Sequence, residues 1–417
     1  MSDQHCVIVG GSHAGAQLCA SLRQEGWTGA ITLVSDEALL PYHRPPLSKA
    51  FLCGDKAEQE LLIRPQAFYE KEKVDVLLGT RAVAIDRARR QLALGDGSHL
   101  HYSKLVLATG ARVRTLDIAG SALPGVFYLR QAHDVLAIRQ ATAPGKRAVI
   151  IGGGYIGLEA AASLRQTGMQ VTVLEAMPRL LQRVTAPEVS AFYARVHGEE
   201  GVNIVTDASV LAIEGKERVE AVVTGDGRRL GADVVIIGVG VLPASELAQQ
   251  AGLTVDNGIV VDECARTSDP DIFAVGDCSN HYNPIYDCRL RLESVQNATD
   301  QARTAAQALC GKTIPYRALP WFWSDQYDLK LQIAGLSQGY DRVVLRGSAG
   351  SGRSFSAFYF KGGRLIAVDA VNRPKDFMIS KRFLADQASA DPERVGDETI
   401  ELRDCFSSTK TEQECLS

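Results

Sequence analysis

The sequence lacks several features that mark specialised protein classes. It contains no Cys-x-x-Cys pair, and its nine cysteines are scattered from Cys6 to Cys415, so neither a disulfide framework nor a zinc site is indicated. No apolar run is long enough to cross a bilayer, and no basic segment leads into an apolar stretch as in a signal peptide. We therefore expect a protein of the reducing cytoplasm without a membrane anchor.

An excess of charge of either sign is also missing. The 45 basic and 49 acidic residues give a formal net charge of -4, far from the basic balance of a nucleic-acid-binding protein. The hydrophobic share of 46% and the charged share of 23% are close to globular averages. A chain of 417 residues exceeds one ordinary hydrophobic core, so we expect two or three domains and no nucleic-acid partner.

Glycine is plentiful, with 38 residues, and some of it lies in an internal repeat. Residues 7–15 read VIVGGSHAG and residues 149–157 read VIIGGGYIG, and the segment ASLRQ follows at 20–24 and again at 162–166. Each copy reads as an apolar strand, a glycine-rich turn, an alanine-rich helix and a second apolar strand. The chain is therefore predicted to contain two βαβ units. The predicted helices end at Gly26 and Gly168, and the second strands are 31–34 and 171–174.

Turns of this kind bind the pyrophosphate of a dinucleotide. The first glycine allows the tight bend, the second lets the backbone approach the phosphates, and the third lets the helix pack on the strand. The N-terminus of the helix then offers its N–H groups and partial positive charge. Gly152, Gly154 and Gly157 complete the second copy, whereas the first has Gly10 and Gly15 with Ser12 between them. We therefore predict two nucleotide sites.

An acidic residue after the second strand of such a unit accepts hydrogen bonds from the ribose. Glu175 has this place in the second copy, and its charge would repel a 2′-phosphate, which favours NADH over NADPH. Arg179 and Arg183 follow closely and leave the preference open, because an arginine could receive that phosphate.

The first copy has Ser35 at the corresponding place. Asp36 or Glu37 would then have to reach the ribose, and we expect Asp36 to do so.

Further segments complete a family pattern. They are RPPLSK at 44–49, LVLATG at 105–110, IIGVG at 236–240, IFAVGD at 272–277, LESV at 292–295 and PWFWSDQY at 320–327. Together with the two turns they make the chain similar to the FAD-dependent pyridine nucleotide reductases and, within them, to the ferredoxin reductases. The resemblance spans nearly the whole chain. It implies an α/β fold with two Rossmann-like dinucleotide-binding domains, of the glutathione-reductase type, and a C-terminal α+β interface domain.

The resemblance also implies domain boundaries. The FAD-binding domain would hold residues 1–113 and 244–318, the NAD-binding domain 114–243, and the interface domain 319–417. This agrees with the repeat, because a first unit interrupted by a complete second one needs a returning segment, which we expect at 271–277. In the last domain two apolar runs joined through KGGR at 361–364 predict a β-hairpin.

Cofactor contacts follow from the resemblance residue by residue. For FAD it implies Ala14 at the pyrophosphate, Asp36 at the adenosine ribose, Ala82 at the adenine through its backbone, Asp277 at the ribityl chain, and Arg130, Lys49 and Val295 at the flavin. For NAD it implies Ile156, Glu159 and Gly240 beside the glycines of the turn and Glu175.

Lys49 and Glu159 carry the predicted chemistry, because Glu159 resembles the acid that pairs with Lys49 near the flavin N5. Hydride arriving at N5 leaves negative charge on the reduced ring, and a nearby ammonium stabilises it. We expect Lys49 to supply this charge and Glu159 to position it. On the residues alone, a structural ion pair at a domain junction stays open.

Three positions depart from the family pattern. Gln296 stands where relatives usually carry proline, Ala244 stands where asparagine is common, and Ser12 replaces a glycine. We expect altered local geometry at these positions rather than loss of cofactor binding.

The electron acceptor is expected to be a small acidic [2Fe-2S] ferredoxin. No cysteine pair is placed for a disulfide relay, although Cys53 leaves a single-thiol peroxidase or oxidase open. By likeness, Trp323 lines the route by which electrons leave, although Trp321 and Trp323 could be core aromatics, which is the commoner fate of tryptophan. Arg64 and Arg303 are candidate docking charges, although an exposed charge is usually only a solvated surface residue. Further candidates are Lys330, Arg342, Lys381 and Arg382.

The expected function is that of a NADH-dependent, FAD-containing ferredoxin reductase, acting as a monomer, whose ferredoxin feeds a haem-thiolate monooxygenase. The reductase component of an aromatic-ring dioxygenase, or a rubredoxin reductase, shares the catalytic half and differs in the acceptor. A NADH-responsive flavoprotein of the apoptosis-inducing-factor type, acting through partners, is an alternative of another class.

Overall fold

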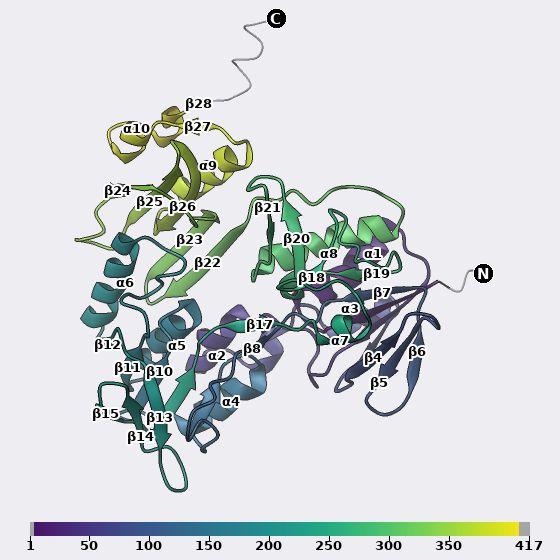
Figure 1. Cartoon of the computed structure of the whole chain (residues 1–417), viewed down its shortest axis with the longest axis horizontal. Helices are drawn as coiled ribbons and strands as arrows, with labels where there is room; N and C mark the ends of the chain where they lie inside the picture. The colour runs from purple at the N-terminus through teal and green to yellow at the C-terminus, as the bar shows by residue number, and fades with distance from the viewer. Residues whose placement is uncertain (1–3, 408–417) are drawn as a thin grey trace, which may run out of the picture. The chain divides into compact units, whose positions relative to one another are not determined.

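The computed structural model describes residues 4–407, which form two compact units. The first unit holds residues up to 43, 59–112 and 241–320, and the second holds 44–58, 113–240 and 321 onward (Figure 1). The three-domain division predicted from the sequence is a different and finer partition, and it stays a prediction.

A five-stranded parallel sheet lies at the centre of the first unit. Its order is β19-β7-β1-β2-β3, and β1 lies in the middle between β2 and β7. The strands are β1 (His5–Val9), β2 (Ala30–Val34), β3 (Val74–Leu77), β7 (Lys104–Leu107) and β19 (Ile272–Ala274). The edge strand β19 is the returning segment predicted at 271–277, so the chain re-enters its first sheet after a long excursion.

Helices cover this sheet and smaller sheets extend the unit. Helix α1 packs on α8, and the alanines of α8 allow the close approach. The helices are α1 (His13–Glu25), α3 (Gln66–Lys71), α7 (Glu246–Gln250) and α8 (Val295–Leu309), with short 3-10 helices η2 (Glu58–Leu61) and η3 (Gly276–Cys278). One small sheet contains β4 (Ala82–Asp86), β5 (Gln91–Leu94) and β6 (His99–His101), and another contains β18 (Ile259–Val260), β20 (Ser279–Asn283) and β21 (Cys288–Leu290). Strand β8 (Ala111–Val113) pairs with β17 (Val241–Pro243).

The second unit repeats the central architecture. Its parallel sheet has the order β12-β11-β10-β16-β9, with β10 in the place of β1. The strands are β9 (Val126–Tyr128), β10 (Arg147–Ile151), β11 (Gln170–Leu174), β12 (Asn203–Val205) and β16 (Val234–Ile237). The helices are α2 (Ala50–Cys53), α4 (Ala132–Ala141), α5 (Tyr155–Gln166) and α6 (Pro187–Glu199), with the 3-10 helix η1 (Pro45–Ser48). A small antiparallel sheet holds β13 (Val210–Glu214), β14 (Ala221–Thr224) and β15 (Arg229–Gly231).

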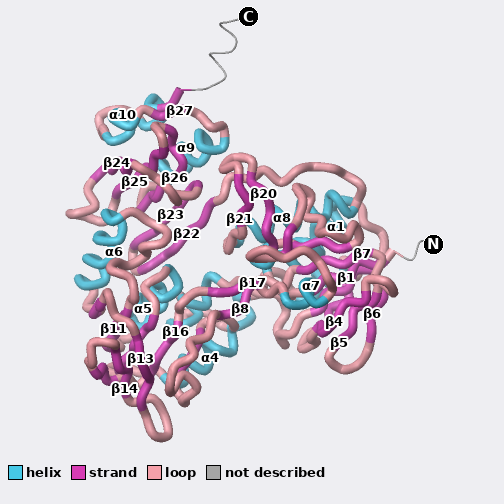
Figure 2. Tube along the Cα trace, viewed as in Figure 1, coloured by secondary structure: helices cyan, strands magenta, loops and turns pink. Residues whose placement is uncertain are grey.

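A five-stranded antiparallel sheet, ordered β22-β23-β26-β25-β24, ends the second unit (Figure 2). Its strands are β22 (Trp321–Gln326), β23 (Leu329–Gly335), β24 (Arg342–Gly347), β25 (Phe355–Lys361) and β26 (Arg364–Val371). Around it lie α9 (Pro374–Ala385), α10 (Pro392–Gly396), η4 (Leu402–Cys405) and the short pair β27 (Ser389–Ala390) and β28 (Phe406–Ser407). The predicted hairpin is confirmed, because Gly362 and Gly363, both at positive φ, join β25 to β26.

The repeat is visible in the ends of its two helices. Gly26 caps α1 in the left-handed conformation, as predicted. Helix α5 ends slightly earlier than predicted, at Gln166, and Gly168 with φ of +86° follows its cap residue Thr167. Within residues 4–407, no helix is both long and apolar enough to span a membrane.

Candidate functional site

At two positions of the first glycine-rich turn, a side chain would collide with the backbone. Gly10 has φ of +122°, and a Cβ there would lie 2.1 Å from the carbonyl oxygen of Ala108. A Cβ on Gly15 would lie 2.1 Å from the carbonyl oxygen of Gly10, so this glycine lets α1 pack against the turn. The backbone of the turn is therefore fixed by tight packing behind it.

The second turn has the same construction. Gly152 has φ of +116°, with a Cβ position 2.3 Å from the oxygen of Gly238, and a Cβ on Gly157 would lie 2.1 Å from the oxygen of Gly152. Gly154 differs, because a Cβ there meets no atom within 4 Å. The middle position therefore faces open space, which is where a pyrophosphate would approach the backbone.

Ser12 of the first turn is explained by this comparison. Ser12 is the N-cap residue of α1 and Gly154 is the N-cap residue of α5, so the two residues occupy equivalent places. Ser12 makes no side-chain capping bond to its helix, so α1 does not depend on its hydroxyl for a cap. The fold therefore accepts a small side chain at the middle position, and Ser12 does not disturb the turn.

We expect two glycine substitutions in the second turn to differ sharply. Gly157→Ala places a methyl group against the oxygen of Gly152 and should raise the Kd for NADH at least tenfold, because the turn must shift. Gly154→Ser copies the first turn and should change the Kd by about threefold or less. Titration of NADH into the two variants measures both values, and equal losses would contradict the assignment of this turn to NADH.

The acidic residues that follow the second strands of the two βαβ units have different surroundings. Both carboxylate oxygens of Glu175 accept backbone N–H bonds, Oε2 from Gly153 at 2.7 Å and Oε1 from Met177 at 2.8 Å. Glu175 therefore holds the turn as well as standing at the predicted ribose position. Asp36 is exposed, whereas Glu37 accepts a hydrogen bond from the Tyr42 hydroxyl.

Arg179 and Arg183 also differ in their hydrogen bonds and exposure. The guanidinium of Arg179 donates to the carbonyl oxygens of Gln182 and Thr185 and to Ser190 Oγ, so it is committed to its own loop. Arg183 is exposed. Of the two arginines that left the NADH preference open, Arg179 is therefore held by hydrogen bonds within its own loop, and Arg183 is the one exposed at the surface.

Several predicted FAD residues gather within the first unit. A Cβ on Gly276, the neighbour of Asp277, would lie 3.4 Å from Ala14 Cβ and 3.6 Å from Ala298 Cβ, so the N-terminal turns of α1 and α8 meet beside Asp277. Val295 is the first residue of α8, whose N-cap Ser294 accepts the Asn297 N–H at 3.1 Å.

Ala82 follows a segment that is bonded beside the first glycine-rich turn. The N–H of Thr80 donates to the oxygen of Ser35, which itself packs against Gly11, and Ala82 begins β4 directly afterwards. The residues predicted at the adenosine end are therefore close together in the fold.

The departures at Gln296 and Ala244 leave the local backbone regular. Gln296 is the second residue of α8, a position where proline and other residues both continue a helix, and its side chain donates to Asp300 at 2.7 Å. Ala244 uses its backbone, accepting from Thr109 Oγ1 at 2.6 Å and donating to the oxygen of Gly110 at 2.9 Å.

Lys49 and Glu159 form an ion pair within the second unit, with Nζ 2.7 Å from Oε2. Glu159 is 2% exposed and Lys49 is 20% exposed, so the carboxylate lies inside and the ammonium reaches towards the surface of the unit. A buried carboxylate needs several donors. Ser48 Oγ supplies a second bond at 2.5 Å and Ser324 Oγ a third at 2.6 Å.

Local structure positions this pair. The two prolines of RPPLSK start η1 and hold Lys49 between η1 and α2, where Nζ also donates to the oxygen of Pro45 at 3.3 Å. Ser163, one turn after Glu159 on α5, donates to the oxygen of Ser48 at 2.7 Å. Glu159 thus cannot move relative to Lys49 without breaking contacts on both sides.

Sequence reasoning missed Ser48 and Ser324 as partners of Glu159. Both lie inside segments that carried the family resemblance, RPPLSK and PWFWSDQY. The alternation of a β-strand separates Ser324 from Trp323, but no pattern shows which face of β22 meets α5.

The remaining predicted residues of this unit are also placed. Arg130 follows β9, and its carbonyl oxygen accepts from Arg44 at 2.8 Å. Ile156 is 47% exposed in the first turn of α5, an exposed apolar side chain beside the open Gly154. Gly240 has φ of +102°, and its oxygen accepts the N–H of Arg114 at 2.9 Å.

Cys53 does not have the setting of a reactive thiol. It is half-buried, its Sγ lies 3.8 Å from the oxygen of Ser163, and burial raises the pKa of its thiol. A reactive thiol needs a lowered pKa, so the single-thiol alternative loses its support. Among the residues described, no group of three or more His, Cys, Asp or Glu side chains is arranged to hold a metal ion.

Trp323 stacks obliquely with Trp321, with ring centroids 5.6 Å apart. Trp321 also contacts Phe377 of α9, and Lys381 Nζ lies 4.5 Å from its ring centroid. Both tryptophans are partly exposed, so they are not simply core residues.

The two predicted docking charges have different surroundings. Arg64 is partly buried and its guanidinium lies 4.4 Å from the Phe68 ring centroid. Arg303 is 56% exposed but pairs with Asp300 at 2.7 Å. Neither is therefore an isolated surface cation, and their docking role stays a prediction.

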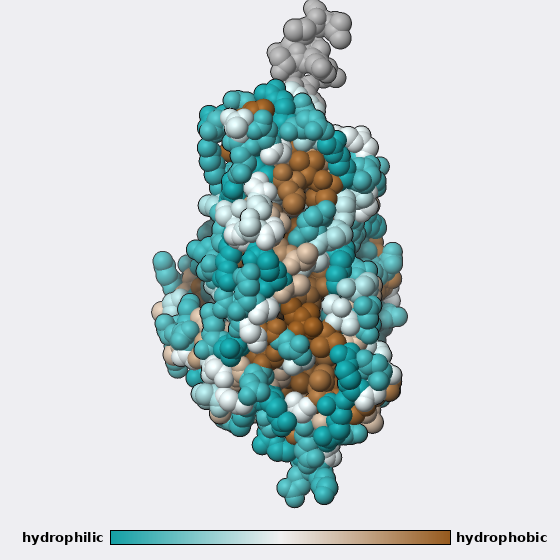
Figure 3. All heavy atoms as spheres, turned by 90° about the vertical axis from the view of Figure 1, so that its left-hand side faces the viewer, coloured by the Kyte–Doolittle hydropathy of each residue, from teal (hydrophilic) through white to brown (hydrophobic). Residues whose placement is uncertain are grey.

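A cavity of about 510 Å³ lies on the second unit, and Leu180, one of its lining residues, packs against Gly153 of the second glycine-rich turn. It is lined mainly by small and apolar side chains of α6 and the neighbouring loop and strand, including Leu180, Pro187, Ala191, Ala194 and Val202. Figure 3 views the side of the molecule on which α6 lies in Figure 1, and apolar atoms gather there among polar ones. Of the candidate residues named from the sequence, Arg179 lines this cavity.

Two family models match the chain. Residues 4–302 match the pyridine nucleotide-disulphide oxidoreductase model, and residues 321–406 match the reductase C-terminal model. The chain is 46% identical over 417 residues to putidaredoxin reductase CamA of Pseudomonas putida, covering 99% of both proteins. It is 44% identical over 398 residues to rhodocoxin reductase of Rhodococcus erythropolis, covering 95% of this chain and 93% of that protein.

A solved structure agrees with these matches. The crystal structure of the covalent putidaredoxin reductase–putidaredoxin complex matches with a TM-score of 0.94 and 46% identity, covering 97% of this chain and 98% of that one. The predicted α/β fold class and the predicted likeness to the ferredoxin reductases are thereby confirmed. From these matches over nearly its whole length, the chain belongs to the pyridine nucleotide-disulphide oxidoreductases that carry the reductase C-terminal domain.

Proposed function

We propose that this enzyme is a NADH-dependent ferredoxin reductase that binds FAD in its first unit and passes single electrons to a [2Fe-2S] ferredoxin. The observation that carries the proposal is the presence of two glycine-rich turns of the same geometry in one chain. A dinucleotide on each turn, one FAD and one NADH, is the requirement for hydride transfer between them. The family implies binding of FAD and NAD(H).

The FAD-binding residues of this chain fit the group. The turn from Gly10 to Gly15 offers backbone N–H groups at the N-terminus of α1, and Asp277 stands beside it through the packing of Gly276 on Ala14. Asp36 is exposed and able to accept from a ribose hydroxyl. When bound, FAD supplies the ring that accepts a hydride and returns electrons one at a time.

Lys49 is the proposed catalytic residue. Its ammonium stabilises the negative charge that hydride transfer places on the flavin, and Glu159 fixes its position through the 2.7 Å ion pair. Three donors keep the Glu159 carboxylate satisfied inside the unit, so Lys49 is held without rearrangement during the reaction.

Glu175 supports a preference for NADH. Its carboxylate stands at the end of β11 beside the turn, where it would accept from the ribose and repel a 2′-phosphate. Arg179 is committed to the loop that follows, which removes one cation that a 2′-phosphate could use.

The ferredoxin acceptor and its place in a monooxygenase system are supported by the relatives. One matching structure is a complex of a reductase with putidaredoxin, and the similarity covers nearly the whole chain. We propose Trp323, partly exposed beside Trp321, as the residue that lines the electron exit. The ferredoxin would feed a haem-thiolate monooxygenase.

The test of this function is NADH oxidation by the purified flavoprotein with a panel of electron acceptors. The panel contains [2Fe-2S] ferredoxins of monooxygenase systems, ferredoxins of aromatic-ring dioxygenases, and rubredoxins. Fast turnover with a ferredoxin of the first kind supports the proposal, and preference for another acceptor indicates the corresponding reductase. A long-lived charge-transfer complex with slow reduction of every acceptor would instead indicate a NADH-responsive flavoprotein.

Docking of an acidic ferredoxin should depend on ionic strength. Raising the salt concentration from about 0.01 M to about 0.15 M shortens the Debye length from about 30 Å to about 8 Å, so we expect the second-order rate constant for ferredoxin reduction to fall several-fold. Arg303→Ala should weaken this dependence, whereas Arg229→Ala, which removes an exposed arginine from the small sheet β13–β15, should not. A rate constant that does not change with salt would contradict electrostatic docking.

A further inference from the structure

A series of four hydrogen bonds leads to Glu159 through the interior of the second unit. Tyr327 Oη lies 3.2 Å from His197 Nδ1, and His197 Nε2 lies 2.8 Å from Gln326 Oε1. Gln326 Nε2 lies 3.2 Å from Ser324 Oγ, which lies 2.6 Å from Glu159 Oε1. We call these five residues the donor series.

The chemistry of the groups gives the series one direction. A carboxylate only accepts, so the Ser324 hydroxyl must donate to Glu159 and must itself accept from the Gln326 amide N–H. The Gln326 oxygen then accepts from His197 Nε2–H, which leaves His197 Nδ1 to accept from the Tyr327 hydroxyl. Every donor therefore points towards Glu159.

Four of the five members of the series have little access to water, and Tyr327 at the outer end is partly exposed. Ser324 and His197 are fully buried, and Gln326 and Glu159 are each 2% exposed. Water cannot replace a missing donor in such a place at low cost, so each group depends on its neighbour in the series. Burial also lowers the pKa of His197, which favours the neutral ring with one donor and one acceptor that the series requires.

Strand alternation separates the series from the aromatic residues of the same strand. Ser324 and Gln326 lie on one face of β22, towards α5 and α6, whereas Trp321 and Trp323 lie on the other face. One strand thus holds both the support of Glu159 and the tryptophan proposed for electron exit.

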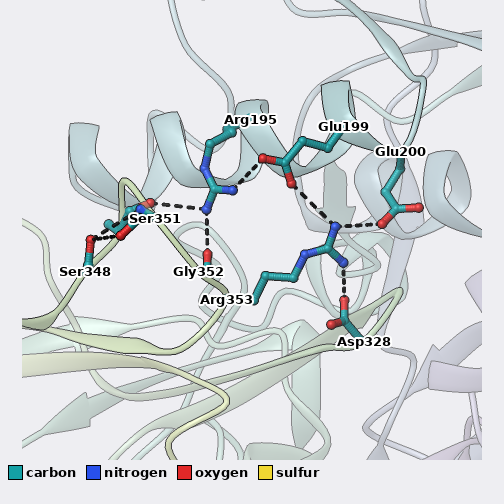
Figure 4. Close-up of polar contacts among 9 residues, drawn as sticks. Arg195, Glu199, Glu200, Asp328, Ser348, Ser351, Gly352 and Arg353 are labelled. Carbon is teal, nitrogen blue, oxygen red and sulfur yellow. Dashed lines mark hydrogen bonds and ion pairs between the residues drawn. The ribbon is translucent and has the colours of Figure 1, made fainter.

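The Tyr327 end of the donor series lies next to a cluster of ion pairs around Arg353, which Figure 4 shows. Tyr327 has φ of +55° in the turn from β22 to β23, and its neighbour Asp328 pairs with Arg353. Arg353 also pairs with Glu200 at 2.7 Å, beyond the end of α6, the helix that carries His197. The cluster therefore ties the β22–β23 turn to α6, the two elements that the series joins.

We propose that Ser324, Gln326 and His197 are positioning residues for the reduction of the flavin, because they hold the Glu159 carboxylate in the orientation that places Lys49. This inference rests on the proposed function and adds a set of residues remote from the nucleotide turns to it. Ser324 acts directly on Glu159, and Gln326 and His197 act through Ser324. The effect of removing a member should therefore decrease with its distance along the series.

The test is stopped-flow reduction of the FAD-loaded enzyme by NADH over a range of NADH concentrations. Ser324→Ala removes the donor to Glu159 and should lower the limiting rate constant about tenfold, with the Kd for NADH unchanged. Gln326→Leu should lower it about threefold, and Tyr327→Phe less than twofold. Ser324→Thr keeps the hydroxyl and should restore at least half of the wild-type rate constant.

A matched control comes from the same sheet. Ser356 is also fully buried, and its hydroxyl donates to the Asp376 carboxylate at 2.9 Å, outside the donor series. Ser356→Ala makes the same chemical change in the same unit and should leave the limiting rate constant as in the wild type. If Ser324→Ala does not fold with FAD bound, Gln326→Leu judged against the same Ser356→Ala control gives the comparison.

The outcomes separate this inference from the proposed function. A wild-type enzyme whose FAD is not reduced by NADH would overturn the function itself. A wild type that reacts, with unchanged rate constants in Ser324→Ala and Gln326→Leu, would overturn only the positioning role. An equal loss of rate in Ser356→Ala and Ser324→Ala would also overturn that role, because general loosening of the sheet would then explain both.

Discussion

Replacement of Lys49 by methionine is expected to slow the reduction of FAD by NADH about a hundredfold, because the positive charge that stabilises the reduced flavin is lost. Methionine has a similar length and no charge, so the shape of the side chain is largely kept. Lys49→Arg keeps the positive charge and should retain more of the rate. The measurement is the limiting rate constant in stopped flow, and a rate constant equal to that of the wild type would end the proposed role of Lys49.

The same substitution has a structural effect that must be separated from the chemical one. Without Lys49, the Glu159 carboxylate remains buried with two hydroxyl donors and no counter-charge, which costs about 3 kcal/mol of folding stability. The double variant Lys49→Met with Glu159→Gln removes that unpaired charge and should recover stability without recovering the rate. Lys312→Met, at an exposed ion pair with Glu25, serves as the control for a lysine of no chemical role.

Asp369 is expected to make the stability of the protein depend on pH. The side chain is fully buried in β26, and burial raises its pKa from 3.8 to about 7, although Tyr359 donates to Oδ2 at 2.5 Å. Oδ1 has no hydrogen-bond partner among the described residues. The folded state therefore binds the proton more tightly than the unfolded state does.

The sign of the effect follows from this difference. The stability that the protonated side chain contributes is fully present below about pH 4 and is lost as the pH rises through about 7, up to about 4 kcal/mol for a shift of three units. Asp369→Asn, which has no proton to lose, should be more stable than the wild type at pH 8 and no more stable at pH 4.

Unfolding by denaturant at the two pH values measures this effect. Asp376→Asn is the matched control, because Asp376 is a second buried aspartate beside the same sheet and accepts from Ser356. A gain of stability at pH 8 that Asp376→Asn shares equally would point to a general effect of removing charge. If Asp369→Asn gains no stability at pH 8, the wild-type protein accommodates the Asp369 carboxylate as an anion.

The repeated βαβ units could be predicted from the sequence because their signal is local. The apolar strand, the glycine turn and the helix follow one another within about thirty residues, and sterics alone require glycine at Gly10, Gly15, Gly152 and Gly157. The hairpin of β25 and β26 was predictable for the same reason, since its turn residues lie between the two strands.

The surroundings of Glu159 could not be predicted in this way. Ser48, Glu159 and Ser324 are separated by 111 and 165 residues along the chain and meet only because η1, α5 and β22 pack together. His197 joins them from α6, and the sequence around it reads as an ordinary amphipathic helix. Hydrogen-bond partners that depend on packing leave no periodic trace in the sequence.

By itself, the sequence determined the two glycine-rich turns and their βαβ units, because steric and periodic constraints act between near neighbours. The returning strand at 271–277 and the residues proposed for hydride chemistry came from the family resemblance. Only the tertiary structure decided that the Gly154 position is open, so that Ser12 is acceptable at the equivalent position of the first turn. It also decided that the thiol of Cys53 is half-buried, which raises its pKa. It also decided that three donors and a directed series of hydrogen bonds surround one carboxylate. Burial and the alignment of distant donors are properties of packing, and packing exists only once the whole chain has folded.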